Sequence, residues 1–237
     1  MNRELLRKIQ SRGYWRVNFH PLSFKRDKIS KLIECVKIIQ DCYVQLRGWS
    51  YPFFREELLY EGGINYGQDY IETEIDFQHH KELWRFYQSA QFIHYRALWE
   101  DWYENEIWFD ERSTIPTPRE IISVEGVIYL LTEIFEFIKR LAKKEIYNEG
   151  LKLVILLVNT ENRRLANTNY EKSGFYNEYK TTLYQINFEK IYYSDDIIIK
   201  SNEYAYEAIS HFFERFKWFP PIKNIQEIQK SFLGRRS

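Results

Sequence analysis

The sequence predicts an α+β fold in which a mixed, mostly antiparallel sheet is partly covered by helices. Segments such as 14–19 alternate between polar and apolar residues, which is the two-residue period of a strand. Stretches such as 124–141 instead repeat apolar residues at helical spacing along one stripe. In order, the segments read β-α-β-β-β-α-β-β-β-α, which is typical of α+β proteins. The 237 residues are expected to form one domain over 1–237, or two packed subdomains over 1–112 and 113–237.

The first half of the chain is predicted to contain two helices and four strands. The strand over 14–19 ends at Pro21, because proline cannot donate to a sheet ladder. The residues of 83–95 are aromatic and β-prone on both faces, which predicts a strand covered on both sides. In order, we expect a helix over 3–12, a strand over 14–19, a helix over 27–41, a strand over 43–47, a loop over 55–69, and strands over 70–77 and 83–95.

The second half begins with the helix-start pattern Thr117-Pro118-Arg119-Glu120, in which the Thr hydroxyl can cap the third amide. Leu151 to Val158 is apolar on both faces and is predicted to be a central buried strand. We expect the first helix to run to the basic residues at 139–144, followed by the strand 151–158, a hairpin over 182–191 and 196–200, a helix over 203–217 and an amphipathic stretch after Pro221. Six apolar side chains are expected to be buried: Leu153, Ile155, Leu156, Ile134, Phe135 and Phe212.

The composition is that of an ordinary globular protein, with 44% hydrophobic and 29% charged residues, but 18% of the residues are aromatic. The longest aliphatic run, Leu153 to Val158, is much shorter than the ~20 residues of a membrane helix. The amino terminus has no apolar signal core, so we expect a cytoplasmic protein without a membrane segment. Cys35 and Cys42 fit neither a zinc knuckle nor a disulfide scaffold, and we expect inert thiols.

Charge is balanced over the whole chain but not along it. The 34 basic and 34 acidic residues give a net charge of zero. Residues 1–49 hold 11 Lys and Arg against 4 Asp and Glu, whereas residues 50–112 hold 5 against 14. These blocks fit either pairing with each other or contact with separate partners. A pI near 7 weighs against general nucleic-acid binding, which needs a cationic surplus.

Motifs of several common enzyme classes are missing from the sequence. It contains no P-loop, dinucleotide-binding glycine pattern, Gly-x-Ser-x-Gly elbow or His-Glu-x-x-His pair, and no cofactor is expected. A metal or acid–base site would need Asp76, His79, His80 and Glu82 to converge, with His94 from the next strand. The same residues fit a polar turn between two strands, which is the interpretation we favour.

Arg85, Gln88 and Gln91 interrupt an otherwise aromatic strand. Because buried polar groups must be hydrogen-bonded, these residues either join an internal network that ties the sheet to the Trp49 turn or face outward to bind. In the second interpretation, aromatic rings stack on bases while Arg and Gln contact base edges or phosphates. An arginine pair after the buried strand fits a phosphate contact at a helix start or a solvated helix face. The candidate nucleic-acid or ligand-binding residues are Arg47, Trp49, Trp84, Arg85, Tyr87, Gln88, Gln91, Arg163 and Arg164.

Four phrases of the chain line up with a family. They are Leu46–Pro52 (LRGWSYP), Glu82–Phe92 (ELWRFYQSAQF), Thr132–Ala142 (TEIFEFIKRLA) and Phe216–Trp218 (FKW). Together they resemble the poorly characterised region that accompanies AlbA_2 (Schlafen-like) DNA-binding domains in bacterial proteins, over most of residues 14–220. The resemblance implies a prokaryotic accessory or sensing module in transcription control or phage defence, whose effector is a separate chain. It carries no catalytic residue, and we expect this chain to be the accompanying region standing alone.

The leading prediction is therefore a non-catalytic module that binds nucleic acid or a separate effector protein. The binding residues would lie in the Arg47/Trp49 turn and the Arg85/Gln88 strand. Two alternatives stay open: a metal-dependent nuclease or hydrolase that uses the turn cluster, and a sensor with a Tyr/Trp-lined pocket for a nucleotide or another anion. Self-association into a homo-oligomer is also compatible with the sequence.

Overall fold

The computed structural model has the predicted α+β architecture and describes residues 2–55, 63–103, 119–167, 175 and 177–234. Its main element is a seven-stranded sheet with the order β2-β3-β4-β5-β1-β7-β9, and each neighbouring pair is antiparallel. Two further strands, β6 and β8, form a parallel pair. The strands are β1 (Tyr14–Pro21), β2 (Asn65–Tyr66), β3 (Tyr70–Phe77), β4 (His80–Tyr87), β5 (Phe92–Ala97), β6 (Ile121–Ser123), β7 (Leu151–Val158), β8 (Arg164–Ala166) and β9 (Gln185–Tyr192).

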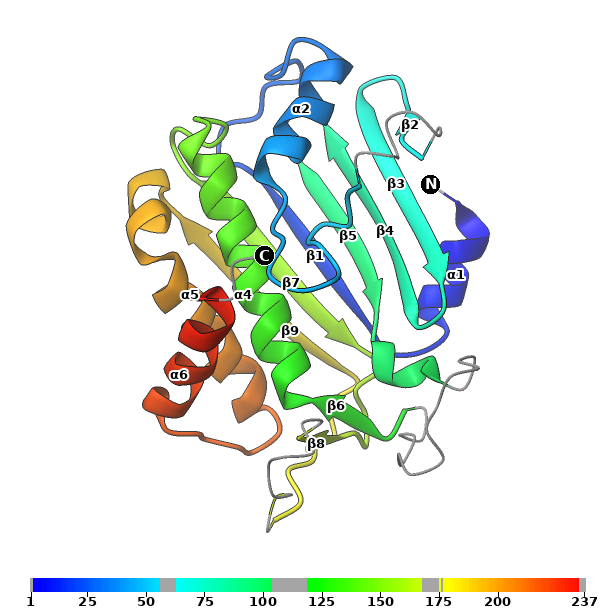
Figure 1. Cartoon of the computed structure of the whole chain (residues 1–237), viewed down its shortest axis with the longest axis vertical. Helices are drawn as coiled ribbons and strands as arrows, with labels where there is room; N and C mark the ends of the chain where they lie inside the picture. Colours follow the sequence, from blue (N-terminus) through cyan, green and yellow to red (C-terminus); the bar gives the residue numbers. More distant parts are fainter. Residues whose placement is uncertain (1, 56–62, 104–118, 168–174, 176, 235–237) are drawn as a thin grey trace.

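Helices lie mainly on one side of the sheet, which we call the covered face (Figure 1). In the described part of the chain they are α2 (Leu32–Cys42), α4 (Val124–Lys143), α5 (Ser194–Glu214) and α6 (Ile222–Leu233). On the opposite side, which we call the open face, α1 (Arg3–Gln10) packs on β4 and β5. The short 3-10 helix η1 (Trp99–Asp101) follows β5.

The main core lies between the covered face and these helices. β1 alternates along its length: Trp15, Val17 and Phe19 are buried on the covered face, and the residues between them are partly exposed on the open face. Phe137 of α4 lies with its ring centroid 6.1 Å from that of Phe19 and 5.2 Å from that of Phe92. Burying a side chain of this kind contributes about 1.5–3 kcal/mol, so strand alternation and the α4 stripe together hold the two layers.

Several predicted elements are confirmed, some with shifted ends. The strand over 70–77 and the central strand over 151–158 are found with those bounds, and the helix over 3–12 ends at Gln10. The helix predicted over 27–41 begins at Leu32, and the stretch after Pro221 is α6. None of the described helices combines the length and apolarity that crossing a membrane requires. Cys35 and Cys42 are free and buried, and burial raises the pKa of these thiols to about 12 and about 11.

The prediction of one long strand over 83–95 is wrong, because a turn divides it into β4 and β5. Tyr87 donates its backbone N–H to the Gln91 carbonyl at 2.9 Å, and Ala90 donates to the Tyr87 carbonyl at 2.8 Å. Ala90 adopts a φ of 64°, a conformation that usually favours Gly or Asn. The sequence therefore lacks the usual turn signal at this position.

Three other local predictions are also wrong. Residues 43–47 form only an isolated bridge, between Val44 and Tyr51. Residues 196–200 are helical rather than the second arm of a hairpin, because α5 begins at Ser194 with two aspartates in the first turn that favour a helix start. The α4 helix begins at Val124 after a Ser123 cap, and Thr117 and Pro118 lie outside the described residues.

Five of the six residues expected in the core are buried, and Leu156 differs. Leu156 is partly exposed because it points to the open face of β7, whereas its neighbour Ile155 is fully buried on the covered face. β7 has apolar residues on both sides, but helices cover only one of them. The prediction of a strand buried on both faces is therefore wrong at Leu156.

Candidate functional sites on the two faces of the sheet

The candidate residues around β4 are divided between the two faces. Arg85 aligns with Glu72 on β3 and Ile93 on β5, and these residues belong to the open face. Trp84 aligns with Thr73 and His94, which belong to the covered face. Residues next to each other in a strand point to opposite sides of a sheet, so no single surface holds all of the candidates.

Arg85 is held on the open face by a carboxylate and an aromatic ring. Its Nη2 lies 2.5 Å from Glu72 Oε2, and its guanidinium lies 3.7 Å from the centroid of the Tyr70 ring. Its Nη1 donates to Tyr87 Oη at 3.2 Å. The Arg85 and Tyr87 candidates are therefore neighbours that contact each other.

The two glutamines of the turn form internal hydrogen bonds. Gln88 Nε2 donates to the Ile29 carbonyl at 2.9 Å, and the Ile29 N–H donates back to the Gln88 carbonyl at 2.8 Å. Gln91 Nε2 donates to Asn18 Oδ1 at 3.1 Å. These contacts correspond to the internal-network interpretation, although Gln88 ties the sheet to the segment before α2 rather than to the Trp49 turn.

The centre of the open face combines aliphatic, aromatic and cationic side chains. Strand pairing aligns Leu83, Tyr95, Arg16 and Leu156 in one row across β4, β5, β1 and β7. The Arg16 guanidinium lies 5.7 Å from the centroid of the Tyr95 ring. Buried Arg16 Nε has no hydrogen-bond partner, and Arg16 has no carboxylate partner within the described ranges. Sequence reasoning missed this arginine, although its strand was predicted.

Several other open-face charges are paired within the chain. Lys152 Nζ lies 2.5 Å from Glu189 Oε1, and Glu72 pairs with Arg85. Asp76 Oδ2 lies 2.6 Å from Lys8 Nζ, and Asp76 Oδ1 lies 3.0 Å from Lys81 Nζ. The face consequently has no large surplus of either sign.

The covered face holds a group of ionisable residues that we call the buried polar cluster: Tyr51, Glu82, His94 and Arg96. Glu82 Oε1 accepts from the Phe53 N–H at 2.9 Å, and its Oε2 accepts from Trp49 Nε1 at 3.3 Å. Glu82 Oε2 also lies 3.8 Å from His94 Nε2 and 3.7 Å from Arg96 Nε. The turn at 49–53 therefore closes over Glu82.

A second ion pair borders the buried polar cluster. Arg47 donates to both carboxylate oxygens of Glu133, with Nε at 2.9 Å and Nη2 at 2.6 Å. Glu133, on α4, is fully buried. Trp84 Nε1 donates to the Phe53 carbonyl at 2.9 Å, and Trp84 is itself fully buried. In this structure Arg47 and Trp84 join the sheet, the turn and α4, and Trp84 presents no ring face for stacking on a base.

Burial also determines the charge states near the buried polar cluster. Burial raises the pKa of the Glu82 carboxyl and lowers that of His94 well below its usual value. Burial lowers the pKa of His79 to about 4 and, with His79 and nearby cations adding to the effect, that of His80 to about 2. The three imidazoles are therefore neutral at pH 7.

The four candidate metal ligands of the turn do not converge. Asp76 points to the open face, where it contacts two lysines, and Glu82 points to the covered face. The His80 ring stacks on Trp49 with centroids 3.8 Å apart and planes 5° apart, and the His79 ring stacks on Tyr103 with centroids 4.9 Å apart. Within the described ranges, no group of three or more His, Cys, Asp and Glu is placed to hold a metal ion.

Arg163 and Arg164 lie at the start of β8 rather than at a helix start. Arg163 is fully buried and makes two bonds to Asp101, at 2.8 and 2.6 Å. Arg164 Nη2 lies 2.9 Å from Glu120 Oε1, and both side chains are about two-fifths exposed, at 41% and 44%. Arg163 is thus a structural ion-pair residue, whereas Arg164 remains accessible.

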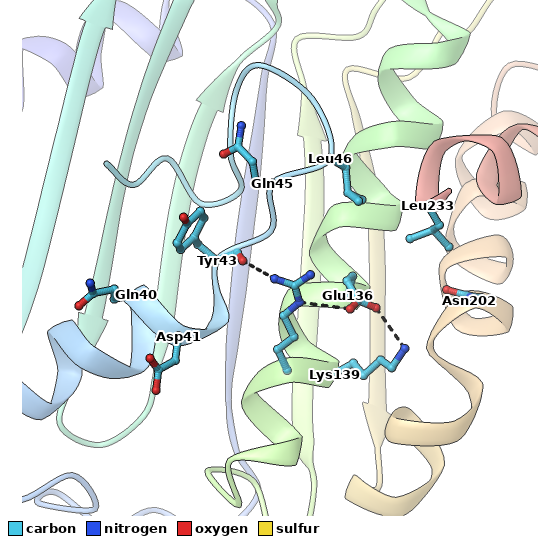
Figure 2. Close-up of a pocket in the computed structure, with 10 residues that line it drawn as sticks. Gln40, Asp41, Tyr43, Gln45, Leu46, Glu136, Lys139, Asn202 and Leu233 are labelled. Atoms are coloured by element: carbon cyan, nitrogen blue, oxygen red, sulfur yellow. Dashed lines mark hydrogen bonds and ion pairs between the residues drawn. The ribbon is translucent and has the colours of Figure 1, made fainter. Parts of the chain in front are cut away.

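A polar groove of about 660 Å³ lies beside α4 (Figure 2). Its wall includes Glu136, which pairs with Lys139 and with Arg140 at 3.2 Å each, and Arg140 also donates to the Tyr43 carbonyl. The charged side chains that α4 contributes to the groove therefore form ion pairs with one another. The lining residues are Gln40, Asp41, Tyr43, Gln45, Leu46, Glu136, Lys139, Arg140, Asn202 and Leu233.

Comparison with known proteins found no relative of this chain. No family model matches the chain, and no match was found among curated proteins or solved structures.

Proposed function

We propose that the protein is a non-catalytic accessory module that binds a separate protein chain through the centre of its open sheet face. The observation that carries this proposal is the row of partly exposed Tyr95, Arg16 and Leu156 on three central strands. The interior of a sheet is an unusual place for accessible aliphatic side chains. A partner that covers them would gain apolar burial worth about 25 cal/mol per Å².

The side-chain chemistry of this face favours a protein over nucleic acid. Aromatic residues and arginine are enriched at the centres of protein interfaces, and the neighbouring Ile93 and Val154 add apolar surface. Nucleic-acid binding depends instead on a surplus of cations, whereas Arg85 and Lys152 of this face are each paired with a carboxylate. Of the two partners that the sequence predicts, nucleic acid and a separate protein, we therefore favour the protein.

Arg16 defines what the partner must offer. Strand pairing places Arg16 between Tyr95 and Leu156, and its guanidinium lies near the Tyr95 ring without a carboxylate from the described part of this chain. A desolvated arginine gains most from a bidentate carboxylate. We expect the partner to present an apolar segment with one Asp or Glu opposite Arg16. The setting in bacterial regulation or phage defence stays a prediction from the resemblance alone.

Site-specific photo-crosslinking in cells that produce the protein tests the proposal. A photoreactive phenylalanine derivative at position 95 should give a covalent adduct with another protein. The same group at position 199 is the control, because Ile199 is 79% exposed on α5, a helix of the covered side. Treating the adducts with nuclease or protease then identifies the class of macromolecule.

The captured protein is next purified, and its affinity is measured for two open-face variants and one control variant. Arg16→Glu and Leu156→Arg should each weaken binding at least ten-fold, and Ile199→Arg should bind like the unchanged protein. The proposal is wrong if position 95 yields no adduct, an adduct with nucleic acid, an adduct with a second copy of this chain, or the same adducts as position 199.

A further inference from the structure

The buried polar cluster contains polar atoms that nothing in the described chain satisfies. Tyr51 Oη, both ring nitrogens of His94 and Arg96 Nη1 have no hydrogen-bond partner among the described residues. Tyr51 and His94 are fully buried, and their ring centroids lie 5.2 Å apart. His94 and Arg96 are alternate residues of β5 and therefore share its covered side. A buried polar group without a hydrogen bond destabilises the fold, so unpaired atoms on three neighbouring residues indicate a bound partner.

The neighbouring carboxylates do not supply the missing acceptor. Glu82 is engaged by the Phe53 N–H and Trp49 Nε1, and its distances of 3.8 Å to His94 and 3.7 Å to Arg96 exceed hydrogen-bond length. Glu133 is occupied by two bonds from Arg47. The missing partner therefore comes from outside the described chain.

The unpaired groups specify the chemistry of that partner. Arg96 and Tyr51 each offer an N–H or O–H, and neutral His94 offers one N–H. A partner that satisfies all three must accept several hydrogen bonds, and the guanidinium additionally favours a negative charge. An oxyanion has both properties, whereas a water molecule supplies no charge.

We propose that the buried polar cluster is a binding site for a small oxyanion of the carboxylate or phosphate class, held by Arg96, Tyr51 and His94. The Arg96 side chain retains 12% exposure, while those of Tyr51 and His94 have almost none. An ion that reaches these groups from solvent would therefore enter beside Arg96. This site lies on the opposite side of the sheet from the protein-binding face and gives the module a means of sensing a metabolite.

Binding should strengthen as the pH falls, because Glu82 is the nearest repelling charge. The groups that face it are His94 and Arg96 of β5, the Trp49 and Tyr51 turn, His80 of β4 and the Arg47–Glu133 pair beside α4. The imidazoles are neutral near pH 7, and Arg47 compensates Glu133. Protonation of Glu82, whose pKa burial raises, removes the repulsion, so anion uptake and proton uptake are linked.

Thermal unfolding in matched buffers tests the site. At pH 6 and constant ionic strength, sodium acetate or sodium phosphate is added to the protein in increasing concentration. The larger anion 2-(N-morpholino)ethanesulfonate is added in the same way as a control. We expect a saturable rise in melting temperature with acetate, phosphate or both, and none with the sulfonate. A response to phosphate alone assigns a phosphate group, and a response to both assigns a general oxyanion site. The acetate response should weaken as the pH rises, because Glu82 then ionises and repels the anion.

Two variants and one control connect that response to the cluster. Arg96→Gln should weaken anion affinity at least ten-fold. Tyr51→Phe removes one unpaired hydroxyl, so it should fold and lose most of the anion response. Tyr192→Phe is the matched control, because Tyr192 Oη is also buried without a partner in the described part of the chain but lies on β9. Equal melting temperatures in all three anions, or an unchanged response in Tyr51→Phe, would overturn the proposal even if Arg96→Gln fails to fold.

Discussion

The open and covered faces of the sheet use the same strands but treat charge in opposite ways. On the open face, Arg85 and Lys152 contact carboxylates beside partly exposed rings and aliphatic chains. On the covered face, alternate residues of the same strands place Glu82 and His94 where water is excluded. Adding or removing a charge on the open face should therefore change the free energy of unfolding only slightly. On the covered face a charge needs a partner, and polar atoms of Tyr51, His94 and Arg96 have no hydrogen-bond partner among the described residues.

The largest expected difference between the faces concerns ion pairs. Arg47→Ala should lower the free energy of unfolding by about 3–5 kcal/mol, because it leaves the fully buried Glu133 carboxylate without its cation. Lys152→Ala should cost less than about 1 kcal/mol, because both members of its pair on the open face are more than one-third exposed. Urea denaturation of the two variants measures both values. Similar losses would mean that the covered pair is not desolvated as described.

A second comparison uses two neighbouring residues of β7. Ile155→Ala should destabilise by about 2–5 kcal/mol, because it opens a cavity in the core. Leu156→Ala should cost about 1 kcal/mol, since its side chain is partly exposed and leaves no enclosed cavity. Denaturant midpoints with unchanged m-values give both numbers. An equal cost for the two variants would indicate that another part of the chain covers the open face.

The two faces also explain what the sequence could and could not predict. Alternation in β1 and the uninterrupted apolar run of β7 are local patterns, so these strands were predicted with nearly correct bounds. The turn at Ser89-Ala90 lacks Gly, Asn and Pro, so local pattern merged β4 with β5. The faces to which β4 residues point are the same with or without the turn. The pairing of β4 with β5, which brings His94 beside Trp84, exists only because of the turn.

The buried polar cluster depends on contacts that sequence spacing does not encode. Tyr51, Glu82, His94 and Arg96 come from a turn and two strands, and they meet only after β4 pairs with β5 and the turn folds over both. The sequence spacing of Glu82 and His94 predicts a site shared with Asp76, but Asp76 lies on the opposite face. Arg16 was overlooked because one arginine in an alternating strand is indistinguishable from an ordinary solvated residue until the covering elements are known.

A buried carboxyl group and an open-face carboxyl group should make stability depend on pH in opposite ways. Glu100 of η1 is buried beside the start of α4, where Oε1 accepts the Ser123 N–H at 2.7 Å and Oε2 has no partner within the described ranges. Burial raises its pKa to about 7, so its stabilising contribution is complete below the unfolded pKa of about 4.5 and is lost as the pH rises through about 7. Asp76 behaves oppositely. Burial raises its pKa, but hydrogen bonds from Lys8 and Lys81 outweigh burial and leave a lowered pKa, so its contribution is present above the unfolded pKa and is lost on acidification.

Glu100→Gln and Asp76→Asn therefore change the pH dependence of stability in opposite directions. Glu100→Gln should flatten the fall in unfolding free energy between pH 4.5 and pH 7, a change of up to about 3 kcal/mol, because the amide oxygen still accepts from Ser123 but carries no charge. Asp76→Asn should flatten the loss of stability below about pH 4, with a smaller amplitude because its side chain is 39% exposed and screened by solvent. Chemical denaturation at half-unit steps from pH 3 to pH 8 measures both. If the unfolding free energy of Glu100→Gln varies with pH in parallel with that of the unchanged protein, the Glu100 carboxyl is hydrated. Its pKa is then not raised by burial.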